Sequence, residues 1–284
     1  MSKVLYKYRG INDNTKDIFI NNKVWYASIP SLNDPNEGLV KSITEKNAKA
    51  FIRRTKEIQM SGFVTSLMIQ KDNPEFKKLK RRISNLNGFE RKYKFMVNWY
   101  KERGRKLSKA EGFLESINTM LKKVGILSLS DNPLSTLMWS HYGDNHKGIA
   151  IGISNFNENA YKKVNYVKST EVPEINLKEY NSVLKMYKDH NEFEISLDDP
   201  HLQLALQTKT QEWEYESEWR GVKEQYGLCS IEGEISEVVF GLNCSKRDRK
   251  EIKQIIQDQG IKGILYKEVY REHDSYEFLI RDCK

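Results

Sequence analysis

Hydrophobic and polar side chains alternate along several short segments of the chain, a pattern typical of strands with one buried face. Aromatic or aliphatic residues alternate with cationic ones over residues 3–9, and a second strand is expected at 23–28. The continuous apolar runs at 124–129 and 148–153 predict buried strands. Further strands are expected at 161–167, in the later half of 212–223, and at 235–240, 263–266 and 276–280.

Helices are predicted between these strands. Asn12 to Asn14 offer caps for a short helix at 15–21, and Ser245 and Gly260 bracket a longer one at 245–259. Shorter helices are expected at 134–142 and 201–209.

Between residues 44 and 123 the composition shifts to Lys, Arg, Glu, Leu and Phe at helical spacing, with breaks near 71–74, 87–88 and 104. The whole pattern predicts an α+β fold, in which a mixed, mainly antiparallel sheet forms the core. We expect a single domain over residues 1–284, with 44–123 as a basic helical insertion.

Composition narrows the class of protein. No stretch of the 284 residues approaches the roughly 18 apolar residues of a membrane-spanning helix, and the N-terminus lacks the apolar segment of a signal peptide, so a cytoplasmic location is expected. Cys229, Cys244 and Cys283 are odd in number and lack CxxC spacing, which argues against a disulfide framework or a thiolate zinc site.

The formal net charge of +8 is unevenly distributed. Lys71–Lys123 holds 16 Lys and Arg against 6 Asp and Glu, a net of +10, whereas the remainder is near neutral. Such a region can bind nucleic acid or another anionic partner through counterion release. A solvated helix face is the alternative interpretation of the same charges.

Four polar and aromatic motifs carry the candidate chemistry: YKYRG, SLNDPNE, MWSHYGDNHKG and EWEYESEWR. The second lies in a turn-rich loop at 29–38, where Asp34 and Glu37 either bind a ligand or only shape the turn. We expect the four motifs to converge on one pocket. Glycine-rich loops of the GxGxxG or GxxxxGK[ST] type are absent from the sequence, which argues against a Rossmann oxidoreductase or a P-loop ATPase.

The third motif raises the question of a metal site. His141 and His146 are five residues apart, whereas two metal ligands on one helix prefer a spacing of four. A nuclease metal site built from His141, Asp144, His146 and a carboxylate of the fourth motif stays an alternative, but structural histidines are favoured and no metal is expected.

The fourth motif alternates strictly if residues 213–220 are extended. Glu214, Glu216 and Glu218 then share one strand face, opposite Trp213 and its aromatic neighbours. Crowded carboxylates raise at least one pKa, an arrangement used in acid and base catalysis. A solvated edge strand or a helix start is the plain alternative.

The order of these motifs resembles the bacterial domain-of-unknown-function family 2971. It runs from YKYR through VWYASIPSLNDPNE and MWSHYGDNHKGIAIGI to WEYESEWR and ISEVVFGLNCS. A more distant analogy is to ADP-ribosyltransferases of the Arg-Ser-Glu type. Arg9, a Ser-x-Ser element (Ser128 and Ser130) and a Glu-x-Glu element (Glu216 and Glu218) occur in the order of that type, although SLS stands where STS is usual and the serine and glutamate pairs are far apart.

The analogy implies an NAD-consuming enzyme, a transferase or a glycohydrolase, with NAD as substrate. Glu218 would stabilise an oxocarbenium-like state, Glu216 would act on the acceptor, Arg9 would hold a phosphate or ribose, and the serines would orient the site. Candidate ligand-binding residues are Tyr26, Asn33, Asp34, Glu37, Trp139, His141, Tyr142, His146 and Arg220. A bacterial toxin or anti-phage defence effector would fit this activity. A nucleotide- or RNA-binding module without catalysis is a third hypothesis.

Overall fold

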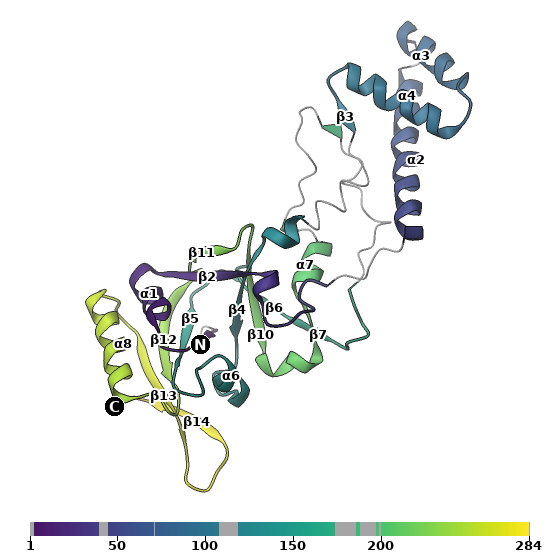
Figure 1. Cartoon of the computed structure of the whole chain (residues 1–284). Helices are drawn as coiled ribbons and strands as arrows, with labels where there is room; N and C mark the ends of the chain where they lie inside the picture. The colour runs from purple at the N-terminus through teal and green to yellow at the C-terminus, as the bar shows by residue number, and fades with distance from the viewer. Residues whose placement is uncertain are drawn as a thin grey trace. The chain divides into compact units, whose positions relative to one another are not determined.

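The computed structural model describes residues 3–39, 45–70, 72–107, 119–173, 186–187, 197–198 and 200–283 (Figure 1). The chain divides into two compact units. The first comprises Met1–Leu39, Leu121–Pro173 and Gln203–Lys284, and the second Val40–Met120 and Glu174–Leu202. Residues 44–123, predicted as an insertion, fall mostly in the second unit.

The first unit is built on one large sheet with the order β11-β2-β4-β1-β5-β12-β13-β14, and β10 pairs with both β4 and β6. Neighbouring strands run antiparallel except for the parallel pair β12 and β13, so the predicted α+β fold with a mixed, mainly antiparallel sheet is confirmed. The strands are β1 Leu5–Arg9, β2 Lys23–Ser28, β4 Gly125–Ser130, β5 Ile149–Ser154, β6 Lys162–Lys163, β10 Glu218–Lys223, β11 Gly227–Ser230, β12 Glu234–Phe240, β13 Leu265–Arg271 and β14 Phe278–Asp282.

Two helices cover one face of this sheet, α1 (Asp13–Asn21) and α8 (Lys246–Asp258), and they lie side by side (Figure 1). Each begins at a capping side chain: the Asn12 side-chain oxygen accepts from the Thr15 main-chain amide, and the Ser245 hydroxyl accepts from the Asp248 main-chain amide. Their apolar faces pack on the sheet to form the main core. This core includes Leu5, Ile18, Phe19, Leu127, Leu129, Ile149, Ile151, Ile153, Val238, Phe240, Ile252 and Ile256.

The opposite face of the sheet carries a smaller core beneath α6 (Thr136–His141). Tyr6 and Tyr8 of β1 pack there with Trp139, whose ring meets Tyr8 edge-on at 4.9 Å. Successive side chains of a strand point to opposite faces, which explains why Leu5 joins the first core and Tyr6 the second. The same alternation determines which of the predicted site residues can lie on one face of the sheet.

The segment from 161 to 223 departs from the sequence prediction. The strand expected at 161–167 is broken into β6 and β7 (Asn165–Val167), and the helix expected at 201–209 ends earlier, as α7 (Pro200–Leu206). β9 (Thr208–Thr210) follows and pairs in parallel with β7. The extended interpretation of 213–220 is wrong over its first half, because Gln211–Glu216 forms a 3-10 helix, η4.

Ser217 explains this correction. Its φ of 46° places it in the left-handed region, where it ends η4 and turns the chain into β10. Residues before and after Ser217 therefore do not share one strand face, and the predicted row of Glu214, Glu216 and Glu218 on a strand does not form.

The second unit includes the helices α2 (Glu45–Ile69), α3 (Pro74–Ser84) and α4 (Phe89–Glu102). They end near the breaks predicted at 71–74, 87–88 and 104, and they share a core that includes Phe63, Leu67, Leu79, Ile83 and Met96. A short pair, β3 (Lys106–Leu107) with β8 (Met186–Tyr187), escaped the sequence prediction. Part of the predicted basic region, Lys71 and residues 108–118, lies outside the described residues. None of the helices in the described ranges combines the length and apolar character needed to cross a membrane.

Candidate functional site

A buried arginine organises the most concentrated polar site of the first unit. Arg220, on β10, is 1% exposed. Its Nε and Nη2 donate to the two carboxylate oxygens of Glu218 at 2.8 and 3.0 Å, and Nη2 also donates to Glu37 Oε1 at 2.5 Å. Nη1 donates to the main-chain oxygen of Leu206 at 2.7 Å. The bidentate contact between Arg220 and Glu218 fixes the Glu218 carboxylate in position and orientation.

Lys209, on β9, is the second cation of the site. Its Nζ lies 2.7 Å from Glu216 Oε2, 3.3 Å from Glu218 Oε2 and 3.5 Å from Glu37 Oε1. The side chains of all four residues are at most 5% exposed. We call these four residues and Arg220 the buried charge network. Its three carboxylates against two cations leave one formal negative charge away from water.

Glu216 connects the network to the surface. The Tyr142 hydroxyl donates to Glu216 Oε1 at 2.6 Å, and the Asn33 side-chain amide donates to that hydroxyl at 2.6 Å. Asn33 is exposed, Tyr142 is half-buried and Glu216 is 4% exposed. The three side chains therefore form a polar route from solvent to the network.

The pKa values follow from burial and from these contacts. Burial by itself raises the pKa of Glu218, but the charge and hydrogen bonds of Arg220, helped by Lys209 and the Ser128 hydroxyl, bring it down to about 2. For Glu37 burial outweighs Arg220 and Lys209, so its pKa is raised. The Glu218 carboxylate is therefore held firmly ionised at neutral pH.

The pKa values of Lys209 and Tyr142 are also shifted. Burial lowers the pKa of Lys209, but the charges of Glu218 and Glu216 outweigh it and raise the pKa overall. Burial and the hydrogen bond to Glu216 raise the pKa of Tyr142, so its hydroxyl keeps the proton that it donates.

The predicted serine and glutamate elements do meet. Glu218 pairs with Ser130 and Arg220 with Ser128 on the adjacent antiparallel strands β10 and β4. Residues directly opposite each other in such a pair point to the same face. The Ser130 hydroxyl donates to the main-chain oxygen of Glu216 at 2.6 Å, which ties the end of η4 to β4.

The SLNDPNE loop contributes Glu37 and Asn33 to the site, while Asp34 shapes the turn. The Asp34 carboxylate accepts from the Asn36 amide at 2.9 Å, and the Glu37 amide donates to the Asp34 main-chain oxygen at 3.2 Å. This arrangement is typical of an Asx turn. Asp34 thus positions Glu37 and does not itself contact the network.

Arg9 does not join these residues. It pairs with Ile149, a member of the core beneath α1 and α8, and its Nε lies 3.4 Å from the Thr15 hydroxyl on α1. Glu218 pairs with Ser130, which pairs in turn with Tyr6 of the opposite face. In the described part of the chain Arg9 forms no ion pair with the glutamates, and strand alternation places the two on opposite faces of the sheet.

Lys7, two residues before Arg9, reaches the main chain of β4 instead. Its Nζ donates to the Ser128 oxygen at 3.0 Å. Burial and the charge of Arg9 lower the pKa of Lys7 to about 8, against the opposing effect of Glu218 and Glu216. The sequence pattern did not single out this lysine.

Two predicted aromatic contacts belong to the core. Tyr26 and Trp139 are each 0% exposed, and the Trp139 indole donates to the Pro133 oxygen at 2.9 Å. Neither ring offers a free stacking surface. Tyr142 is the aromatic residue of the predicted set that touches the network.

The two histidines do not converge. His141 is exposed and lies near the rings of Tyr142 and Tyr215, whereas His146 contacts the Ser140 hydroxyl at 3.1 Å and the Phe278 ring edge-on. Within the described ranges, no group of three or more His, Cys, Asp or Glu is placed to hold a metal ion. The alternative metal site at His141, Asp144 and His146 is thus not assembled.

Sequence reasoning missed Lys209 and Tyr166. The Tyr166 hydroxyl accepts from the Glu218 amide at 2.8 Å, and Lys209 also lies 4.5 Å from the centre of the Trp213 ring. Both residues belong to the short parallel pair β7 and β9, whose strands of three residues are too short to show periodicity. The one available signal was a lysine three residues before the acidic motif that begins at Glu212.

The first unit is thus an α+β domain whose mainly antiparallel sheet supports a buried charge network. Residues 138–221 match the family model described as Protein of unknown function (DUF2971), in agreement with the resemblance predicted from the motifs. The matched segment includes Tyr142, Lys209, Glu216, Glu218 and Arg220. No curated protein and no solved structure matches the chain.

Proposed function

We propose that the buried charge network is the centre of an NAD-consuming enzyme, an ADP-ribosyltransferase or an NAD glycohydrolase. The observation that carries the proposal is the adjacency of the serine and glutamate elements, with Glu218 opposite Ser130 on neighbouring strands. Enzymes of the Arg-Ser-Glu type, to which the sequence is analogous, need these two elements on one face.

The chemistry suits the carboxylates. Breaking the bond between nicotinamide and ribose passes through a state with oxocarbenium character, which an ionised carboxylate stabilises. Glu218, with a pKa near 2 and a fixed orientation, supplies such a charge. Glu216, at the inner end of the route through Tyr142 and Asn33, is placed to act on the acceptor, either water or a macromolecule.

The guanidinium in this proposal is Arg220. Arg9 lies on the other face of the sheet and receives no role. Arg220 is a positioning residue, since it touches Glu218 and Glu37 and holds the first of them ionised.

The test is incubation of the full chain with NAD, alone and with bacterial cell extract, followed by chromatography of the products. The proposal expects free nicotinamide in both cases or with extract only. Accompanying free ADP-ribose identifies a glycohydrolase, and ADP-ribose bound to a macromolecule identifies a transferase. Glu218→Gln should abolish the release.

Circular dichroism of Glu218→Gln is required alongside, because the substitution also removes a partner of Arg220. Absence of nicotinamide release by the wild-type chain with any extract, or wild-type release by a folded Glu218→Gln chain, would overturn the proposal.

A further inference from the structure

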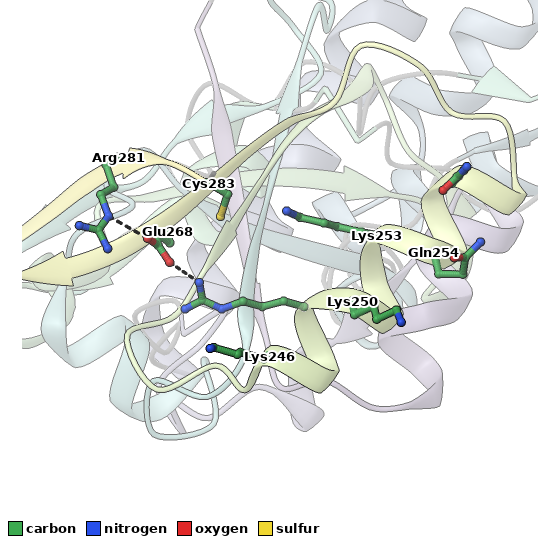
Figure 2. Close-up of a pocket in the computed structure, with 9 residues that line it drawn as sticks. Lys246, Lys250, Lys253, Gln254, Glu268, Arg281 and Cys283 are labelled. Atoms are coloured by element: carbon green, nitrogen blue, oxygen red, sulfur yellow. Dashed lines mark hydrogen bonds and ion pairs between the residues drawn. The ribbon is translucent and has the colours of Figure 1, made fainter.

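Away from the buried charge network, α8 and the strands β13 and β14 enclose a groove of about 570 Å³ (Figure 2). Its volume lies within the range of about 300–1,000 Å³ that is typical of ligand sites. The groove is lined by Lys246, Arg249, Lys250, Lys253, Gln254, Gln257, Glu268, Arg281 and Cys283.

The lining is strongly basic. Five cations face a single carboxylate, which leaves a formal charge of +4. Glu268 lies between the two arginines, as the dashed lines of Figure 2 show: Arg281 Nε donates to its Oε1 at 2.7 Å and Arg249 Nη1 to its Oε2. One carboxylate thus orders two guanidinium groups and neutralises only one of them.

The three lysines carry the unbalanced charge. Lys246, Lys250 and Lys253 stand at spacings of four and three residues, which places them along one side of α8. Within the described part of the chain no carboxylate forms an ion pair with them.

Two of the three acidic residues of α8 are engaged elsewhere, and the third, Asp258, accepts from the Gln254 side-chain amide at 2.8 Å. Glu251 pairs with Lys16 of α1 at 2.6 Å, and Asp248 accepts from the Ser245 hydroxyl at 2.7 Å at the start of the helix. Their separation from the lysines keeps the groove side of α8 cationic. Among the residues that line the groove, an anion therefore meets one carboxylate, that of Glu268.

The spacing of the lysines points to a chain of phosphates. The helical rise from Lys246 to Lys253 is about 10 Å. In a DNA duplex that length corresponds to about three phosphates of one strand, whose charges are roughly 3.4 Å apart along the helix axis. The ordered arginines add planar donors of the kind that bind phosphate oxygens in pairs.

We propose that this groove, which we call the α8 groove, binds the sugar-phosphate backbone of a nucleic-acid strand. The inference does not depend on the NAD proposal, because it rests on different residues. It also assigns the nucleic-acid site to the first unit, whereas the charge count of the sequence placed it in Lys71–Lys123.

The test is the anisotropy of a short fluorescein-labelled single-stranded RNA titrated with the full chain at several salt concentrations. A chain with Lys246, Lys250 and Lys253 all changed to Glu should bind at least about 10-fold more weakly. With the three lysines changed to Gln, the slope of log affinity against log salt should be shallower by about 2, since each phosphate contact on a single strand contributes roughly 0.7.

The matched control changes Lys77, Lys78 and Lys80 to Glu. These lysines are exposed on α3 in the second unit and equal the groove lysines in number. The proposal expects the control to bind RNA like the wild type. The proposal is overturned if the control loses RNA binding while the groove variants bind RNA like the wild type. It is also overturned if the chain binds anionic phosphatidylserine vesicles through these lysines but does not bind RNA.

Discussion

The buried charge network and the α8 groove are built from the same residue types, but their charges differ in burial and in pairing. In the network the cations and carboxylates contact each other and are almost fully buried. In the groove five cations share one carboxylate, and the three lysines remain at the surface or half-buried. Burial forces charges to find partners within the chain, because an unpaired charge away from water costs several kcal/mol. Exposed charges are free to pair with a ligand.

Substituting one arginine in each region tests this difference directly. Arg220→Met leaves Glu37 and Glu218 buried without their guanidinium, so we expect the free energy of unfolding to fall by about 3–5 kcal/mol. Arg281→Met removes one of the two arginine partners of Glu268, at a side chain that is 59% exposed, and should cost at most about 1 kcal/mol. Chemical denaturation of both variants measures the difference. Equal losses would mean that the network is not buried as described.

Acid titration sharpens the comparison through a smaller effect. The folded-state pKa of Glu218, about 2, lies below its ordinary value of 4.5. A depressed carboxyl pKa stabilises the fold above the ordinary value, and this contribution is lost as the pH falls from about 4.5 towards 2. Glu37, whose pKa is raised, works in the opposite direction.

Glu268 provides the counterpart in the groove. Hydrogen bonds and charge from Arg249 and Arg281 lower its pKa, but its side chain is 17% exposed. The thermal midpoint of Glu218→Gln should therefore depend less on pH below 4.5 than that of the wild type, while Glu268→Gln should follow the wild type more closely. A Glu218→Gln chain with the wild-type pH dependence would contradict the assigned pKa.

Much of the sheet was predictable because local signals and burial agree. The alternation in β1, the apolar runs of β4 and β5, and the capping residues Asn12 and Ser245 all specify their elements without reference to distant residues. Of the four motifs expected to meet, the SLNDPNE loop, Tyr142 and the Glu216–Arg220 segment do contact one another, whereas Arg9 of the YKYRG motif lies elsewhere.

The failures occur where long-range contacts decide the local structure. The alternation of residues 213–216 looks like a strand, but Lys209 and Tyr142 draw Glu216 inward and Ser217 turns the chain. Arg9 belongs to the YKYRG motif, yet a shift of one position along a strand decides which face a side chain occupies. Lys209 gave almost no signal, since its role depends on three glutamates brought together by folding.

The proposed role of the buried charge network in NAD cleavage is tested most directly by the rate of nicotinamide release in two neighbouring variants, Glu216→Gln and Glu214→Gln. Glu216 belongs to the network, and Glu214 is exposed on the same 3-10 helix. We expect a loss of about 100-fold or more for Glu216→Gln, the size expected when a catalytic carboxylate is neutralised, and the wild-type rate for Glu214→Gln. Equal rates for both variants and the wild type would contradict it.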